Sequence, residues 1–378
     1  MKERLGNYIS EYSVRNKDDQ NIPVYSVTNA NGFCTEYFGK EVASKDKKTY
    51  KLVPRNYFAY NPSRINVGSI DCQTKEDIVI VSPLYVVFSA DDRIDNRYLY
   101  YYLKSDVANY YIREKATGSV RDNLKFSMLA EFPIKIRPLD EQHNLAKRLD
   151  LLKKLIDNYQ TEISLLDQLI KSRFVELFGD PLANPKKWEL IPLLKMGNCK
   201  NGMNFHNDDF GIELHCLGVG DFKDYTSIED TSKLSVVGLK AMPSADYFLE
   251  NDDIVFVRSN GNKKMVGRSI LVYPHDTPTI FSGFCIRFRK SDDRVNILYL
   301  LHVLKADSIR QLMYGRGANI QNLNQQTLAS IKIPVPPLKL QKKFVNELTQ
   351  INKSKAVIQK SLDEAQLLFD SLMQEYFG

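Results

Sequence analysis

The chain has 378 residues, of which 43% are hydrophobic and 26% are charged, and its formal net charge is +6 at pH 7. This composition is typical of globular proteins and excludes wholesale disorder, and the length corresponds to two or three domains of roughly 100–200 residues each. No stretch approaches the ~18 apolar residues of a membrane span, and MKERLGNYIS has no signal-peptide core, so we expect a cytoplasmic protein without a membrane contact. The cysteines are scattered and odd in number, which fits a reducing compartment: Cys34, Cys72, Cys199, Cys216 and Cys285.

In chain order, two mixed α/β blocks alternate with two long helical segments. Residues 1–137 form the first block, 138–179 the first long helix, 180–336 the second block and 337–378 the second long helix. Asn96–Glu114 and Asn296–Met313 have the composition of helices inside the blocks. Short runs rich in β-branched and aromatic residues predict strands at Ile78–Ser82, Tyr85–Phe88, Ile134–Ile136, Ile254–Val257, Ser269–Tyr273, Cys285–Phe288 and Ile331–Val335.

An internal repeat relates the two halves of the chain. Residues 118–179 align without a gap with residues 317–378 at an offset of 199, and 17 of the 62 positions are identical. The similarity continues upstream, where SPLYVVF (82–88) resembles SGFCIRF (282–288) and Leu103-Lys104 resembles Leu304-Lys305. We therefore predict an α+β protein in which two tandem mixed α/β domains are related by a pseudo-two-fold axis.

The two long segments have the pattern of coiled-coil helices. Neither contains Gly or Pro between the proline that precedes it (Pro138 or Pro337) and the closing glycine (Gly179 or Gly378). Apolar residues recur at alternating spacings of four and three, with one charged interruption in each seam, Arg173 and Lys355. One small block cannot cover so long a stripe, so we expect the helices to pair antiparallel, to pack on helices of a partner, or both. The predicted seam comprises Leu145, Leu149, Leu152, Ile156, Ile163, Leu166 and Ile170 in the first helix, and Phe344, Leu348, Ile351, Ile358, Leu362, Phe369 and Leu372 in the second.

Polar loops between the strands hold the candidate binding residues. Lys and Arg neutralise phosphates, and Arg and Asn read base edges, so these loops fit a double-stranded DNA partner. The candidates are Lys45, Lys48, Asn61, Arg64 and Arg121 in the first block, and Arg258, Asn260, Lys263, Lys264 and Arg316 in the second.

Enzyme signatures are absent from the sequence. There is no phosphate-binding glycine loop, no nuclease core and no standard spacing of metal ligands, and His206, His215 and Cys216 match no zinc pattern. We therefore expect no catalytic residue, no metal site and no cofactor in this chain.

The end of each block, where it enters its long helix, resembles the specificity subunit of Type I restriction-modification systems. The first copy reads Asn123-Leu124-x4-Leu129-x4-Ile134-x-Ile136-x-Pro138-Leu139-x-Glu141-Gln142, and the second reads Asn322-Leu323-x4-Leu328 followed by Ile333-Pro334-Val335-Pro336-Pro337-Leu338-x2-Gln341. Two copies of the motif, each leading into a long helix, extend the resemblance over the whole chain. The first copy departs from the pattern at Lys135 and Arg137, and the second has Leu340 in place of the usual glutamate.

The resemblance implies a non-catalytic subunit with two target-recognition domains, each of which reads half of a bipartite, asymmetric DNA sequence. It implies that the helices form an antiparallel coiled coil that sets the unread spacer. It also implies two methyltransferase subunits as partners, and restriction subunits if the system has them, with S-adenosylmethionine, Mg and ATP bound by those partners. The alternative from another class is a coiled-coil adaptor that binds partner proteins and not DNA.

Overall fold

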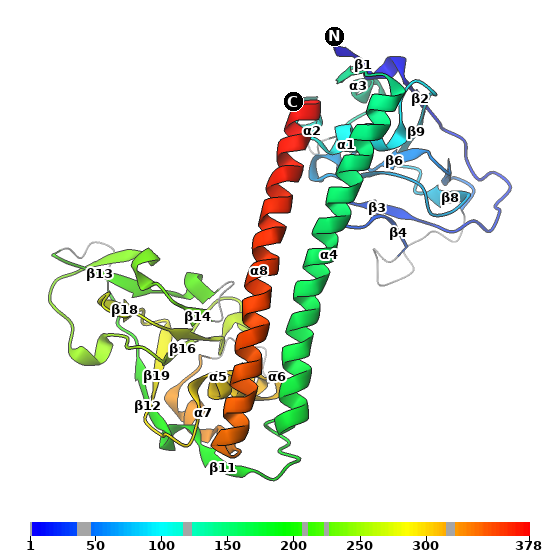
Figure 1. Ribbon diagram of the computed structural model, residues 1–378. Helices are drawn as coiled ribbons and strands as arrows, with labels where there is room; N and C mark the ends of the chain where they lie inside the picture. The colour runs from blue at the N-terminus through cyan, green and yellow to red at the C-terminus, as the bar shows by residue number, and fades with distance from the viewer. Residues whose placement is uncertain (1, 36–46, 116–122, 206–210, 223–226, 315–321) are drawn as a thin grey trace. The chain divides into compact units, whose positions relative to one another are not determined.

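The computed structural model describes residues 2–35, 47–115, 123–205, 211–222, 227–314 and 322–378. The chain divides into two compact units (Figure 1). Unit 1 comprises Met1–Glu162 and Ile358–Gly378, and unit 2 comprises Ile163–Val357. No helix in the described ranges combines the length and the apolarity that a membrane crossing requires.

Unit 1 is built on a four-stranded antiparallel sheet of order β2-β9-β6-β7, with β3-β4, β5-β8 and β1-β10 as separate pairs. One face of this sheet and helices α1 and α2 enclose a core that includes Phe58, Phe88, Tyr98 and Tyr102. The strands are β1 (Lys2–Arg4), β2 (Ile9–Glu11), β3 (Ser26–Thr28), β4 (Gly32–Cys34), β5 (Lys51–Pro54), β6 (Phe58–Tyr60), β7 (Ile70–Cys72), β8 (Ile78–Val81), β9 (Val86–Ala90) and β10 (Pro133–Lys135). The helices are α1 (Asn96–Lys104), α2 (Asp106–Lys115), α3 (Phe126–Leu129) and the start of α4 (Leu139–Phe178).

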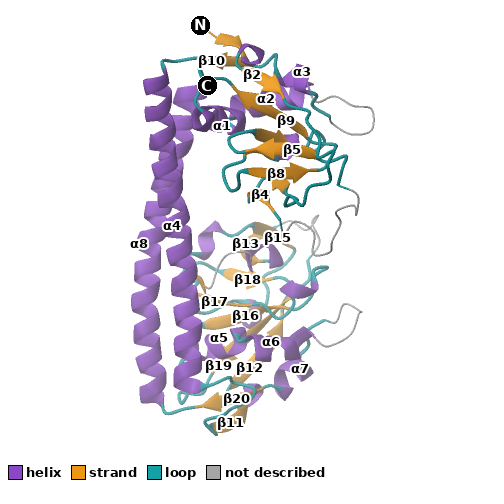
Figure 2. Ribbon diagram, turned by 90° about the vertical axis from the view of Figure 1, so that its right-hand side faces the viewer, coloured by secondary structure: helices purple, strands orange, loops and turns teal. Residues whose placement is uncertain are grey.

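Unit 2 repeats this plan with a larger sheet of order β12-β19-β16-β17-β14, a second sheet β15-β13-β18 and the pair β11-β20 (Figure 2). The three central strands β19, β16 and β17 correspond to β9, β6 and β7 of unit 1. The strands are β11 (Glu189–Pro192), β12 (Gly197–Asn201), β13 (Ile212–Leu217), β14 (Ser227–Ile228), β15 (Val236–Leu239), β16 (Asp253–Val257), β17 (Ser269–Val272), β18 (Thr279–Phe281), β19 (Cys285–Lys290) and β20 (Lys332–Val335). The helices are α5 (Ile297–Lys305), α6 (Asp307–Tyr314), α7 (Gln325–Ser330) and the start of α8 (Leu338–Phe377).

The seven predicted strands are confirmed to within two residues at each end, and the two predicted helical stretches are confirmed, each as a pair of helices. Asn96–Glu114 is divided into α1 and α2 at Ser105, and Asn296–Met313 is divided into α5 and α6 at Ala306. Ser105 and Ala306 both have extended backbone dihedral angles, with ψ of 159° and 136°. Ser105 stabilises its break because its Oγ accepts a hydrogen bond from the Ala108 amide, whereas Ala306 offers no such cap.

Helices α4 and α8 pack antiparallel, as predicted. In unit 2 the two charged interruptions of the seam are ion pairs between the helices: Arg173 Nε lies 2.6 Å from Glu347 Oε2, and Lys355 pairs with Asp167. The predicted seam residues are buried or half-buried throughout. Gly179 ends α4 with φ +78°, and its amide donates to the Val175 carbonyl at 2.8 Å, as expected for a glycine cap.

Each unit is closed by the end of a long helix that begins in the other. Phe377, at the end of α8, packs 5.1 Å from the Tyr98 ring in unit 1. Phe178, at the end of α4, packs 4.8 Å from the Tyr299 ring in unit 2. Phe178 and Phe377 are equivalent in the repeat, so both units use the same aromatic closure.

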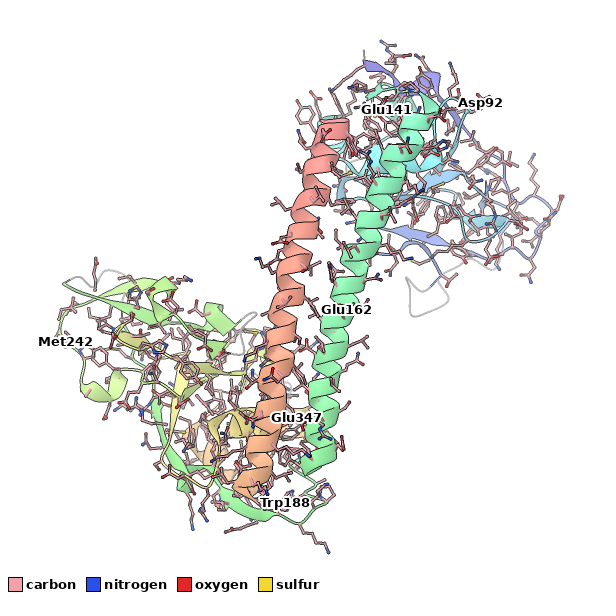
Figure 3. The ribbon with its side chains drawn as sticks, in the orientation of Figure 1. Asp92, Glu141, Glu162, Trp188, Met242 and Glu347 are labelled. Atoms are coloured by element: carbon pink, nitrogen blue, oxygen red, sulfur yellow. The ribbon has the colours of Figure 1, made fainter. Side chains whose placement is uncertain are left out.

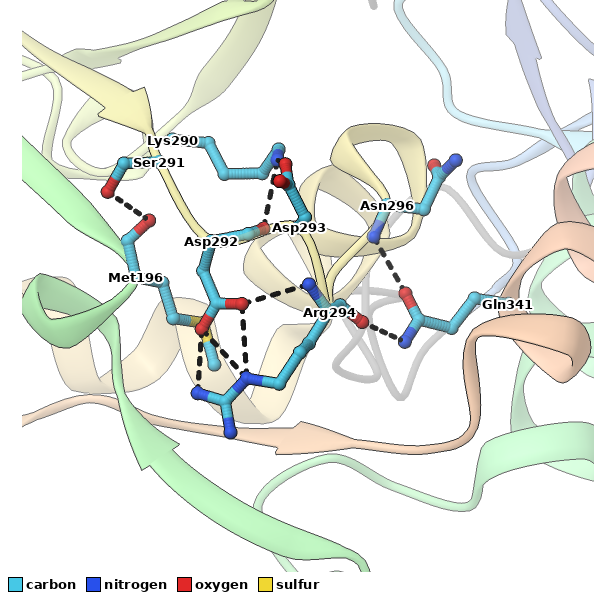
Figure 4. A network of polar contacts seen from close by, with 8 residues as sticks. All are labelled: Met196, Lys290, Ser291, Asp292, Asp293, Arg294, Asn296 and Gln341. Atoms are coloured by element: carbon cyan, nitrogen blue, oxygen red, sulfur yellow. Dashed lines mark hydrogen bonds and ion pairs between the residues drawn. The ribbon is translucent and has the colours of Figure 1, made fainter.

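A fully buried glutamine fixes the start of each long helix. Gln341 accepts a hydrogen bond from the Asn296 amide at 2.8 Å and donates to the Arg294 carbonyl at 3.0 Å (Figure 4). It also donates to the Pro336 carbonyl at 2.8 Å. In unit 1 the residue that makes the equivalent three bonds is Gln142, with partners Asp95, Arg93 and Arg137. We call these two groups the glutamine nodes.

The contact between the first block helix and the long helix differs between the units. In unit 1, Asp150 of α4 accepts hydrogen bonds from the Tyr101 hydroxyl at 2.7 Å and from Arg97 Nε at 3.1 Å. In unit 2 the position of Tyr101 is taken by His302, whose ring lies 5.2 Å from Phe344. A polar contact in one unit is therefore an aromatic contact in the other.

Candidate nucleic-acid interface

The same loop occupies the same place in both units. In unit 1 it runs from Asn61 to Ser69, between β6 and β7, and in unit 2 it runs from Arg258 to Arg268, between β16 and β17. A backbone hydrogen bond joins each loop to a segment far along the chain, from Leu124 to Pro62 at 3.2 Å and from Leu323 to Arg258 at 2.9 Å. Leu124 and Leu323 are equivalent in the repeat, so Pro62 and Arg258 are equivalent too.

Strand register adds a third segment to this place. The pairing of β6 with β9 puts Leu84 opposite Pro62 when it is continued past Tyr60, and the pairing of β16 with β19 puts Phe284 opposite Arg258. We call each convergence a loop junction. The junction of unit 1 consists of Pro62, Leu84 and Leu124, and that of unit 2 consists of Arg258, Phe284 and Leu323.

Four of the five candidates of unit 2 lie on this loop. Arg258 is half-buried, and its Nη1 donates to the Gly283 carbonyl at 3.2 Å. Asn260 Oδ1 accepts from the Asn262 amide at 2.7 Å, which shapes the loop. Lys263 and Lys264 lie in a turn of 3-10 helix, Lys263–Met265, with Lys264 exposed.

In unit 1 the loop carries Asn61 and Arg64. Asn61 Oδ1 accepts from the Ser63 amide at 3.1 Å, and Arg64 is exposed. Lys48 lies on a turn before β5. Lys45, Arg121 and Arg316 lie outside the described residues, and the assignment of all ten candidates to DNA stays a prediction. Leu124 and Leu323, which come after Arg121 and Arg316 in the sequence, are hydrogen-bonded to the loops at the loop junctions.

Sequence reasoning missed two equivalent lysines at the ends of α1 and α5. Lys104 of unit 1 donates from Nζ to the Gly68 carbonyl at 2.6 Å and faces Asp71. Burial lowers the pKa of Lys104, and Asp71 opposes that effect. This lysine therefore ties the loop of unit 1 to α1 through partners within the unit.

Lys305 of unit 2 has the opposite surroundings. Burial, together with the guanidinium groups of Arg268 and Arg310, lowers its pKa to about 8. Within the described residues its ammonium group has no hydrogen-bond or ion-pair partner. Arg310 donates from Nη2 to the carbonyl of Lys264 at 2.8 Å, so this group of three cations lies directly against the candidate loop. The repeated pair Leu103-Lys104 and Leu304-Lys305 was the available sequence signal.

The site has no features of a metal or nucleophile centre. Among the described residues, no group of three or more His, Cys, Asp and Glu side chains could hold a metal ion. Burial raises the pKa values of Cys72, Cys199 and Cys216 to about 12, so their thiols stay protonated at neutral pH. His215 Nδ1 lies 3.0 Å from the Leu234 carbonyl, and His206 lies outside the described residues.

The outer surface of α4 carries a second apolar stripe in addition to the seam. Leu151 and Leu155 are 61% and 39% exposed, and Leu165 and Leu169 are 55% and 49% exposed. The second pair follows the first by fourteen residues, or two heptads, so the four leucines share one face of the helix.

The family model and the relatives found by comparison with known proteins all concern Type I specificity subunits. The family model for the Type I restriction modification DNA specificity domain matches residues 5–168 and 185–367. The specificity subunit of the Type I restriction enzyme StySPI from Salmonella potsdam is 25% identical over 301 residues, which cover 74% of this chain but only 64% of that subunit. The MjaVIII specificity subunit from Methanocaldococcus jannaschii is 24% identical over 343 residues, which cover 84% of this chain and 78% of that subunit.

Solved structures show the same fold. The S subunit of a Type I restriction-modification system from M. genitalium has a TM-score of 0.58 at 18% identity, with 100% of this chain and 96% of that chain covered. A chain from a structure concerned with complex assembly and conformational transition of the type I R-M system has a TM-score of 0.60 at 16% identity, with coverage of 100% and 97%.

Proposed function

The chain belongs to the Type I restriction-modification DNA specificity family, whose subunits recognise DNA sequence and are not catalytic, and on this premise we propose that each unit reads one half of a bipartite, asymmetric target. The observation that carries the proposal is the pair of loop junctions. Equivalent loops of divergent sequence stand on equivalent strands in the two units, with Asn61 and Arg64 in one and Arg258 to Lys264 in the other. Equivalent placement with different side chains suits the reading of two different half-sites.

We propose that methyltransferase subunits bind the chain along its long helices, one to each of two equivalent positions. The exposed leucines of α4 support this arrangement, because a partner helix laid on them would remove their apolar surface from water. S-adenosylmethionine would then be bound by these partners, and Mg and ATP by the partners that act on or move along DNA, including restriction subunits where the system has them.

Helix length sets the spacer between half-sites in this proposal. One heptad inserted into both α4 and α8 lengthens the coiled coil by ~10.5 Å, and this corresponds to roughly three base pairs of B-DNA. The modified motif of such a variant should keep both half-sites and gain about three unread positions. An unchanged motif would show that the helices do not set the spacer.

The decisive experiment is co-expression with the methyltransferase encoded next to this chain, followed by genome-wide mapping of N6-methyladenine. A single split, asymmetric motif that disappears when this chain is omitted is the expected result. Methylation of an unchanged motif without this chain, or no methylation by a demonstrably assembled complex, would contradict the proposal.

A further inference from the structure

Two large apolar side chains are exposed to solvent at equivalent positions of the two units. Leu84 is 79% exposed and Phe284 is 59% exposed. Each precedes the central strand β9 or β19 and lies in a tight turn, closed by a hydrogen bond from Tyr85 to Ser82 at 3.0 Å or from Cys285 to Ser282 at 2.8 Å. A single exposed apolar residue is ordinary, but the same exposure at both copies of a divergent repeat indicates a shared role.

The backbone holds both side chains at the loop junctions. The Phe284 carbonyl accepts hydrogen bonds from the amides of Arg258 at 2.8 Å and Ser259 at 3.3 Å. In unit 1 the register of β6 with β9, continued two residues past Tyr60, places Pro62 opposite Leu84, and proline has no amide hydrogen to donate. The two positions therefore correspond by strand register, and the hydrogen bonds to the carbonyl belong to unit 2.

Two features identify the kind of surface that these side chains meet. In unit 2 the residue joined to Phe284 through the backbone is the cation Arg258, and Lys263 and Lys264 lie further along the same loop. In unit 1, Arg64 lies on the corresponding loop. An apolar group among cations matches DNA, which presents phosphates beside the methyl groups of thymine and the faces of the bases.

We propose that Leu84 and Phe284 make equivalent apolar contacts with a base, one in each half-site. The inference rests on the proposed DNA-reading function and assigns it two specificity-determining residues that carry no charge. Such a contact contributes discrimination at one position of a half-site, while the cations nearby supply affinity that does not depend on sequence.

The test uses the complete chain assembled with its methyltransferase and compares Leu84→Ala and Phe284→Ala with two matched controls. Met242→Ala removes a side chain that is 62% exposed on an outer loop of unit 2 (Figure 3), and Val14→Ala removes one that is 46% exposed in unit 1. All four substitutions should leave thermal unfolding unchanged, because the side chains are exposed. Phe284→Ala should weaken binding of the cognate duplex about tenfold and relax one position of one half-site. Leu84→Ala should have a smaller effect of the same kind on the other half-site, and the two controls should bind as the unsubstituted chain does.

Uracil in place of each thymine of the target, introduced one at a time, separates two forms of the contact. Weaker binding by the unsubstituted complex, but not by the Phe284→Ala complex, would identify a thymine methyl, and equal binding would identify the face of the base. If Phe284→Ala and Leu84→Ala both bind and methylate the cognate duplex like the controls, the inference is wrong. If the unsubstituted complex does not bind DNA, the proposed function itself fails, so the two failures are distinguishable.

Discussion

Gln142 and Gln341 make the same three hydrogen bonds in the two units, whereas Lys104 and Lys305, which are also equivalent, have opposite electrical surroundings. The glutamine nodes hold the long helices, and the lysines lie beside the loops. The difference indicates that the repeat has kept the glutamine contacts that hold the start of each long helix and has changed the contacts of its loop face. Two copies that hold equivalent partners but read different half-sites require this division.

Loss of a glutamine node should have the largest effect on stability. Gln142→Ala and Gln341→Ala each remove a fully buried side chain and leave one amide and two carbonyls without a partner, so each should cost about 3 kcal/mol. Trp188, the only tryptophan, lies in unit 2, and its Nε1 donates to the Phe178 carbonyl at 3.3 Å (Figure 3). Its fluorescence in urea should therefore report the Gln341→Ala change directly. Circular dichroism should report both variants, and unequal losses would show that the nodes are not equivalent.

Acid should destabilise unit 2 through His302, whose counterpart in unit 1 is Tyr101. Burial lowers the pKa of His302 to about 4, below the value of 6.5 for an exposed histidine. Between these values the unfolded chain binds more protons than the folded chain, so stability falls as the pH falls from 6.5 to 4. At pH 5 the loss should be about 2 kcal/mol. Urea unfolding followed at Trp188 should show this loss in the unsubstituted chain but not in His302→Phe, and parallel pH profiles would contradict the assignment.

The two equivalent lysines should respond to the same substitution with opposite signs. Lys104→Met removes one of the two hydrogen bonds to the Gly68 carbonyl, which keeps the Ile70 amide as its donor at 2.8 Å, and it takes a cation away from Asp71, so it should cost about 1 kcal/mol. Lys305→Met removes a charge that faces two arginines and should stabilise unit 2 by about 1 kcal/mol at pH 7. The folded-state pKa of Lys305 is lowered from 10.5 to about 8, so its cost is fully present below pH 8 and disappears as the pH rises to 10.5. Unfolding measured at pH 7 and pH 10 should therefore show the full Lys305→Met gain at pH 7 and only a small part of it at pH 10.

The smallest expected effect is a difference between the two lysine variants in the salt dependence of DNA binding. If the cluster of Arg268, Lys305 and Arg310 contacts a phosphate, Lys305→Met should reduce the slope of log affinity against log salt by about 0.9. Lys104→Met should leave the slope unchanged, because Lys104 is held by partners within its own unit. Equal slopes for both variants would exclude a phosphate contact at Lys305.

The long helices and the repeat were predictable from the sequence, while the loop junctions and the cluster of Arg268, Lys305 and Arg310 were not. Forty residues without Gly or Pro and a sustained heptad pattern determine α4 and α8 almost alone. Three-residue strands such as β6 (Phe58–Tyr60) are too short to show a period of two. The helix break at Ala306 also has no local signal, because alanine favours the helix it interrupts. The approach of Leu124 to Pro62, and of Arg268 and Arg310 to Lys305, depends on tertiary packing that no local pattern records.

The discontinuity of unit 1 has a consequence for biosynthesis. Tyr376 and Phe377 belong to the same core as Leu5 and Tyr98, whereas unit 2 is one continuous stretch, Ile163–Val357. Residues 358–378 are therefore made after all of unit 2, although unit 1 begins to emerge from the ribosome first. The part made first must wait for the segment made after unit 2, and during that interval its aromatic closure is open to chaperones.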